Sequence, residues 1–257
     1  MLDKKQTYLQ VALNSTLEDA HRIISQIPLD KRIIIEAGTP LIKAYGIQAI
    51  RSIRTWWEQR IFGLPQESFA GTEMSPLLSA LIKGFLEKRK TAKPQIAVFN
   101  PYIVADLKCM DRGTREVEIA SQGGANAAVA LGHAPTETLD SFIEECEKHG
   151  LDSMIDMMNV EFSLSVLREL KKPPKIVLLH RGVDEETFDP ESEIPYHEIH
   201  RIKENYDILV GVAGGDTFQE IQRAIFNDAD IIVVWKSFYQ STDETAKLAE
   251  QFLKDIR

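Results

Sequence analysis

The chain has 257 residues, of which 44% are hydrophobic and 27% charged, so it can bury a sizeable core in one large α/β domain or two small ones. Lys and Arg number 30 against 39 Asp and Glu, which gives a formal net charge of -9. This acidic balance, without a cluster of basic and aromatic residues, argues against nucleic acid as a partner. The N-terminus is too polar for a signal peptide, and no stretch is apolar enough to span a membrane. Cys109 and Cys146 lack metal-type spacing, so we expect a cytoplasmic protein with two reduced thiols.

Eight short apolar runs recur along the chain, and helical patterns follow them. Their hydrophobicity is continuous rather than alternating, which is typical of parallel strands buried on both faces. The runs are Tyr8 to Leu13, Arg32 to Gly38, Tyr102 to Lys108, Asn126 to Gly132, Ser153 to Met158, Lys175 to His180, Asp207 to Gly215 and Asp230 to Trp235.

The segments between these runs carry helix start signals. A Ser-Thr pair at residues 15–16 and a Pro-Thr-Glu-Thr sequence from Pro135 precede amphipathic stretches, as do residues 216–217 and 242–243. Eight strand–helix units predict a closed (β/α)8 barrel of the TIM type, as a single domain over residues 1–257. A doubly wound open sheet is the alternative.

One connection is longer than its unit requires. A helix is expected to begin near Pro40, and after it the chain runs on through Trp56 and Trp57. Between about residues 55 and 94 we predict an insertion that holds at least one helix, from Pro76 to about Lys90. The insertion could decorate the barrel wall, contact another subunit or cover the active site, and its aromatic residues indicate that part of it is buried.

Polar residues gather where the predicted strands end, which is where active sites form in barrels of this type. In chain order they are Asn14, Glu36, Asp106, Lys108, Asp111, His133, Asp156, His180, Arg181, Gly214, Gly215, Lys236 and Ser237. Asp106 and Lys108 are two residues apart on one strand, so both side chains should project into the barrel mouth. They form either a structural ion pair or a metal ligand beside a group that stabilises developing negative charge.

Glu36 ends an apolar run, where a glutamate is unfavourable. With Asp106 it could supply the carboxylates by which Mg²⁺ is usually held, or it could pair with Lys108 alone. Asp156, an acid in an apolar strand, belongs either to the same charged cluster or to a peripheral structural contact. His180 is a candidate proton carrier, with a hydrogen-bonded packing role as the alternative.

Gly214 and Gly215 follow the seventh predicted strand and precede a helix. Free backbone N–H groups at such a position can bind a phosphate. We therefore include both glycines among the candidate substrate contacts.

Two motifs, ADLKCMD at residues 105–111 and EAGTPLIK at residues 36–43, resemble those of the orotidine 5'-monophosphate decarboxylase suprafamily. Within it, the chain is most similar to the 3-hexulose-6-phosphate synthase branch and its sister, 3-keto-L-gulonate-6-phosphate decarboxylase. The similarity extends from Leu9 to the last helix. It implies a phosphate-binding (β/α)8 barrel that works as a homodimer with shared active sites.

Three details favour the synthase branch. Residues 156–157 are Asp-Met, as in the synthases, whereas the sister enzymes have Glu at this place. Val183 replaces the second Arg of the decarboxylases' H-R-x-R-D motif, and residues 213–215 match the synthase sequence A-G-G. Orotidine monophosphate decarboxylases differ in their fifth to seventh strands.

The resemblance implies a carbon–carbon lyase that adds formaldehyde to D-ribulose 5-phosphate, or reverses that reaction, through an enediolate. Glu36 and Asp106 would ligate Mg²⁺, and Lys108 would stabilise the enediolate oxygen. Asp111 would reach into the partner subunit's site, and His180 would move protons. We include Asp156 among the expected catalytic residues, with Lys108, Asp111 and His180. Substrate contacts are expected from Asn14, Glu36, Asp106, Gly214, Gly215, Lys236 and Ser237.

The chain departs from the family pattern at two strand ends. Asn14 stands where the family has Asp, and an amide cannot act as a base. Trp235 stands where the family has a Gly beside the phosphate. Three alternatives therefore stay open: a relative with a different, possibly non-phosphorylated substrate, a carboxy-lyase like orotidine phosphate decarboxylase, or a catalytically silent barrel that acts in binding or assembly.

Overall fold

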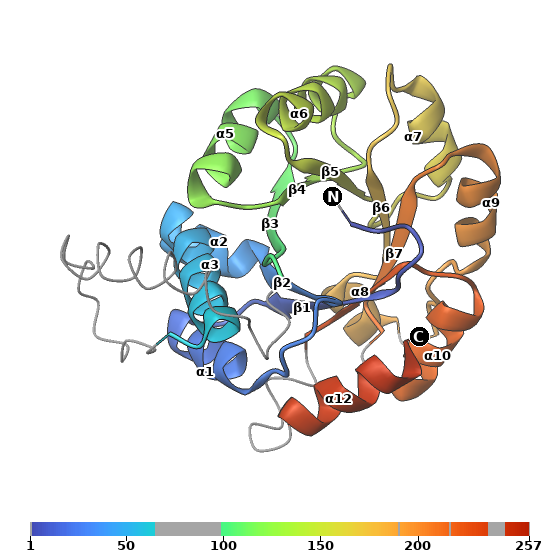
Figure 1. The fold of residues 1–257 in the computed structure, drawn as a ribbon. Helices are drawn as coiled ribbons and strands as arrows, with labels where there is room; N and C mark the ends of the chain where they lie inside the picture. The colour runs from blue at the N-terminus through green and yellow to red at the C-terminus, as the bar shows by residue number, and fades with distance from the viewer. Residues whose placement is uncertain (1, 65–98, 190, 216, 236–244, 257) are drawn as a thin grey trace.

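The computed structural model describes residues 2–64, 99–189, 191–215, 217–235 and 245–256 (Figure 1). Eight parallel strands pair in chain order, and β1 also pairs with β8, which closes the sheet into a barrel. The strands are β1 (Tyr8–Leu13), β2 (Ile33–Ala37), β3 (Ile103–Cys109), β4 (Ala127–Leu131), β5 (Asp152–Asp156), β6 (Ile176–His180), β7 (Leu209–Ala213) and β8 (Ile231–Val234). The predicted (β/α)8 barrel is confirmed, and the doubly wound open sheet is wrong.

The helices form a ring around the strands (Figure 1). They are α1 (Leu17–Gln26), α2 (Thr39–Tyr45), α3 (Ile47–Phe62), α5 (Gly113–Gly123), α6 (Thr136–His149), α7 (Ser163–Glu169), α8 (Val183–Phe188), α9 (His197–Asn205), α10 (Phe218–Phe226) and α12 (Thr245–Asp255). Two of the predicted start signals cap helices: Thr16 caps α1 by accepting a hydrogen bond from the Asp19 backbone, and Thr217 caps α10 by accepting one from the Glu220 backbone. The signal at residues 242–243 lies outside the described residues. None of the helices in the described part of the chain has the length and apolar character needed to cross a membrane.

The strands are apolar on both faces because each face packs against a different partner. On β1, Leu9, Val11 and Leu13 belong to the core between strands and helices. Tyr8 and Ala12 alternate with them and belong to a second core inside the barrel. This two-sided burial explains the continuous hydrophobicity of the sequence runs, and it directs every second strand residue toward the barrel interior.

The helix predicted to begin near Pro40 is α2, and the backbone turns at Gly46, with φ of 58°, before α3 begins. Residues 55–62, where the insertion is expected to begin, continue α3 on the barrel wall. Trp57 is fully buried there, and the helix ends only at Gly63. The helix expected from Pro76 to about Lys90 lies outside the described residues.

Candidate active site

A cavity of about 680 Å³ lies at the carboxyl ends of the strands. The predicted residues that line it come from six strands or the loops just after them: Asn14, Glu36, Asp106, Lys108, Asp156, His180, Arg181 and Gly214. The cavity therefore brings together most of the polar residues that strand-end position alone identified. Its volume is in the range of a small-molecule site.

Lys108 lies at the centre of a charged cluster in this cavity. Its Nζ is 3.3 Å from Oδ2 of Asp106 and also pairs with Oδ2 of Asp156. Burial alone would lower the pKa of Lys108, but Asp106 and then Asp156 outweigh burial and raise that pKa above its usual range. The side chain thus remains an ammonium at neutral pH and cannot act as a base.

The backbone that presents Lys108 is irregular. The pairing of β3 with β4 shifts register between Ala105 and Cys109, and Lys108 itself has φ of 48° in the left-handed region. Such a conformation is uncommon for a residue with a side chain and occurs most often at functional sites. Alternation along the strand correctly predicted that Asp106 and Lys108 share the cavity, although it did not predict this bulge.

Asp156 connects Lys108 to His180. The side chain is 0% exposed, and its Oδ2 lies 2.8 Å from Nδ1 of His180, while Oδ1 accepts a hydrogen bond from the Met158 backbone at 2.9 Å. Burial would raise the pKa of Asp156, but His180 and Lys108 hold it well below its usual range. Because the ionised carboxylate only accepts hydrogen bonds, Nδ1 is the donor, and Nε2 is the ring nitrogen able to exchange a proton with a substrate.

Glu36 and Asp106 form the second half of the cluster. Gln10 donates a hydrogen bond from Nε2 to Oε2 of Glu36. Burial, followed by repulsion from the charge of Asp106, raises the pKa of Glu36 to about 7. Thr39 donates to Oδ2 of Asp106 at 2.8 Å.

The oxygens of this pair suit a hard cation. Oδ1 of Asp106 is buried and has no hydrogen-bond partner among the described residues, which is costly for a carboxylate unless another group binds it. The described residues contain no cluster of three or more His, Cys, Asp or Glu side chains that could hold a metal. A carboxylate pair nevertheless fits Mg²⁺, which usually takes one or two carboxylates and completes its shell with water and substrate oxygens.

Two glycines shape the edge of the cavity. A Cβ on Gly38 would lie 1.8 Å from Oδ1 of Asn14, so the Asn14 side chain needs a glycine there. Gly214 has φ of 96°, and a Cβ on it would lie 2.3 Å from the Arg181 carbonyl oxygen. Gly215 packs instead against α10, where its Cβ position is 2.9 Å from Cβ of Glu220.

Two further predicted residues, Asp111 and His133, do not line the cavity. Asp111 is exposed beyond β3, where its Oδ1 accepts a hydrogen bond from the Arg112 backbone at 2.8 Å. His133 is also exposed, and its Nε2 lies 2.7 Å from the Asn159 carbonyl oxygen. Lys236 and Ser237 lie outside the described residues.

Sequence reasoning missed two groups and marked a third as a departure. Gln10 lies within an apolar run, although a buried polar residue inside a strand is itself a signal. Thr39 belongs to the motif EAGTPLIK, but no site role was predicted for it. Trp235 lines the cavity with Gly214 and packs against the core inside the barrel.

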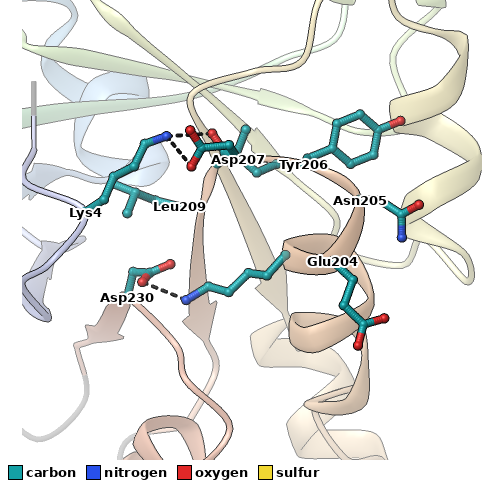
Figure 2. Close-up of a pocket in the computed structure, with 9 residues that line it drawn as sticks. Lys4, Glu204, Asn205, Tyr206, Asp207, Leu209 and Asp230 are labelled. Atoms are coloured by element: carbon teal, nitrogen blue, oxygen red, sulfur yellow. Dashed lines mark hydrogen bonds and ion pairs between the residues drawn. The ribbon is translucent and has the colours of Figure 1, made fainter.

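A second hollow, of about 350 Å³, lies at the opposite end of the barrel (Figure 2). Lys4 pairs there with Asp207 at 2.7 Å, and Lys203 pairs with Asp230 at 2.7 Å. Both lysines that line this hollow are thus paired with carboxylates, and none of the predicted site residues lines it.

Comparison with known proteins agrees with the geometry. Residues 87–251, more than half of the chain, match the Orotidine 5'-phosphate decarboxylase / HUMPS family. Among curated proteins, the chain is 36% identical over 253 residues to the bifunctional enzyme Fae/Hps of Methanosphaera stadtmanae, covering 96% of this chain and 52% of that protein. It is 34% identical over 255 residues to the bifunctional enzyme Fae/Hps of Methanocella arvoryzae, covering 96% and 54%. The chain thus spans about half the length of these curated relatives.

Solved structures share the fold. The crystal structure of 3-hexulose-6-phosphate synthase from Salmonella typhimurium aligns with a TM-score of 0.69 and 22% identity, covering 96% of this chain and 99% of that one. That of 3-keto-L-gulonate-6-phosphate decarboxylase from Vibrio cholerae aligns with a TM-score of 0.64 and 14% identity, covering 98% and 99%. With its eight-stranded barrel and the family match over residues 87–251, this chain belongs to the orotidine 5'-phosphate decarboxylase / HUMPS family.

Proposed function

We propose that this chain is a Mg²⁺-dependent aldehyde-lyase of the 3-hexulose-6-phosphate synthase type. It would join formaldehyde to D-ribulose 5-phosphate, or cleave the product, through an enediolate. The relatives named Fae/Hps and the folds of the synthase structures support this assignment. Since the chain spans about half of those relatives, we propose that it corresponds to their Hps part.

The observation that carries the proposal is the buried charged cluster at the cavity. An aldol addition requires a carbanion beside a carbonyl, and the developing charge must be stabilised on oxygen. Lys108 supplies an ammonium that remains protonated, fixed between Asp106 and Asp156. A cation held in this way stabilises a developing oxyanion without reorganising during the reaction.

His180 is the proposed proton carrier. Asp156 accepts the hydrogen bond from its Nδ1 and fixes the ring, so that Nε2 can take a proton from the substrate carbon and return one to the product. Lys108 cannot take this role because it stays charged. Asp156 therefore acts on both partners, as the counter-ion of Lys108 and the orienting group of His180.

Glu36 and Asp106 are the residues that would hold Mg²⁺, and the unpartnered Oδ1 of Asp106 supports this choice. When bound, the ion would supply positive charge that lowers the energy of the enediolate. As a further part of the proposal, the protein is a homodimer in which Asp111, exposed at the end of β3, reaches the partner subunit's site.

The test is formaldehyde consumption in the presence of ribulose 5-phosphate. We expect turnover with Mg²⁺, loss of turnover with EDTA, and loss in Lys108→Met. Lys4→Met removes an ion-paired lysine at the opposite end of the barrel and serves as the control that should stay active. A wild-type protein that consumes no formaldehyde under any of these conditions would overturn the proposal.

A second candidate keeps the same machinery but takes another substrate. It is favoured by Trp235, whose indole shares the cavity with Gly214, and by Asn14, which cannot act as a base. Thermal unfolding with added Mg²⁺ and ribulose 5-phosphate separates the two, since a ligand stabilises the fold only if it binds it. Stabilisation by metal without stabilisation by the sugar phosphate would favour the other substrate, and stabilisation by neither would favour a silent barrel.

A further inference from the structure

Gln10 is a polar side chain in the middle of the barrel interior. It is 0% exposed and lies on β1 between Tyr8 and Ala12, whose side chains belong to the core inside the barrel. Its register partners on β2 and β8 are Ile34 and Val233, which belong to the same core. A primary amide in such apolar surroundings is unfavourable unless its polar atoms are hydrogen-bonded.

The amide of Gln10 is only half satisfied. Its Nε2 donates to Oε2 of Glu36, while its Oε1 is buried without a hydrogen-bond partner among the described residues. A methionine has nearly the same length and carries no acceptor to leave unpaired. For the fold alone, an apolar residue would therefore serve at least as well as glutamine.

The hydrogen bond that Gln10 does make is directed at the cavity. Glu36 is 5% exposed and lines the cavity. It follows Ile34 by two residues on β2, so both side chains lie on the same face of the strand. A carboxylate on a flexible side chain has several rotamers, and a donor from the neighbouring strand selects one of them. The hydrogen bond thus restrains the position of Oε2 and limits the rotamers open to Glu36.

We propose that Gln10 is a positioning residue for Glu36: its amide holds the carboxylate in the orientation required to bind a divalent cation together with Asp106. The metal part of this inference rests on the proposed function. Gln10 itself acts through Glu36 and contacts no substrate. Hydrogen bonds to ligating carboxylates are a known means by which proteins set metal affinity.

The experiment compares Gln10→Met with the wild type in the absence of substrate. Mn²⁺, used in place of Mg²⁺, is titrated and followed by electron paramagnetic resonance. We expect the variant to bind Mn²⁺ about 10- to 100-fold more weakly, with a Tm equal to or above that of the wild type. Gln59→Met is the matched control, because Gln59 is also buried with an unpaired Oε1 but lies on α3 outside the barrel. It should leave Mn²⁺ affinity unchanged.

A metal-free crystal structure of Gln10→Met provides a readout that does not depend on the proposed function. We expect the Glu36 carboxylate to leave its wild-type orientation. The inference is wrong if the carboxylate stays in place, or if the variant loses Tm while its Mn²⁺ affinity is unchanged. If the wild type binds no Mn²⁺, the metal part of the proposed function fails, and the position of Glu36 in the variant still decides whether Gln10 holds it.

Discussion

Asp156→Asn tests the cluster most directly, because it removes one charge and changes little else. An asparagine can keep the hydrogen bond from the Met158 backbone through its own Oδ1. It cannot serve as the counter-ion of Lys108, and it no longer favours the Nδ1–H form of His180. The substitution therefore separates the ionic contribution of Asp156 from its packing.

The expected loss of stability follows from the burial of the pair. Removing one partner of a fully buried ion pair costs about 3–5 kcal/mol. The Lys108 side chain is 19% exposed and keeps Asp106 at 3.3 Å, so the loss should be smaller. We expect a free energy of unfolding that is about 2–3 kcal/mol lower, which corresponds to a Tm lower by about 4–12 °C in a chain of this size.

The pH dependence of this loss has a defined sign. In the folded state the pKa of Asp156 is held below its usual 3.8, so the ionised carboxylate stabilises the fold fully above that value. The contribution disappears as the pH falls from 3.8 through the lower folded-state pKa. The difference between wild type and variant should therefore become smaller below about pH 4.

Urea unfolding followed by tryptophan fluorescence measures both quantities. Asp207→Asn is the control, because Asp207 pairs with Lys4 but is 94% exposed, and its removal should change the free energy of unfolding little. The reasoning fails if Asp156→Asn costs no more than this control at pH 7, or if the cost is undiminished near pH 3.

Four further substitutions or treatments test other parts of the site. Lys108→Met should lower kcat by roughly 10²–10³-fold, the usual effect of removing one group that stabilises an oxyanion, while unfolding by urea stays cooperative. Gly38→Ala should lower Tm because the new Cβ would lie 1.8 Å from Oδ1 of Asn14. Adding Asn14→Ala should restore part of the lost Tm in a double-mutant cycle, and strictly additive effects would contradict a contact between residues 38 and 14. Cys109 should react slowly with iodoacetamide in the native protein and quickly in urea, because burial, then Glu116, raises the pKa of its thiol to about 12; equal rates would be inconsistent with this environment. Mixing Lys108→Met and Asp111→Ala proteins, each expected to be inactive alone, should restore formaldehyde consumption if the two residues act across a dimer. A mixture without activity would contradict shared sites, and an Asp111→Ala protein that is active alone would show that Asp111 is dispensable.

The barrel could be predicted because its determinants are local. Each strand is buried on both faces, so eight continuous apolar runs marked the strands to within a few residues. The period of two then placed Asp106 and Lys108 in one cavity, and strand-end position identified Glu36, Asp156 and His180. These inferences need only the direction of side chains along a strand and the general position of barrel active sites.

The remaining features depend on contacts between distant segments. The left-handed backbone at Lys108 accompanies a register shift against β4, and register between strands cannot be read from one strand. The role of Gln10 depends on its hydrogen bond to Glu36, which lies on another strand and 26 residues away in the sequence. The extent of α3 was underestimated because Trp57 was assigned to an insertion, whereas it is buried on the barrel wall.

The charge balance of the cavity links these observations. Glu36, Asp106 and Asp156 bring three carboxylates to one cluster, while Lys108 brings one ammonium and already pairs with two of them. Counting these four groups alone, the cluster carries two excess negative charges, which a buried site does not tolerate without compensation. The high pKa of Glu36 is one form of compensation, because a proton there removes one of the two charges. A divalent cation bound by Glu36 and Asp106 would neutralise both excess charges, and Asp156 would remain the counter-ion of Lys108. The cation would also give a partner to Oδ1 of Asp106, which has none among the described residues.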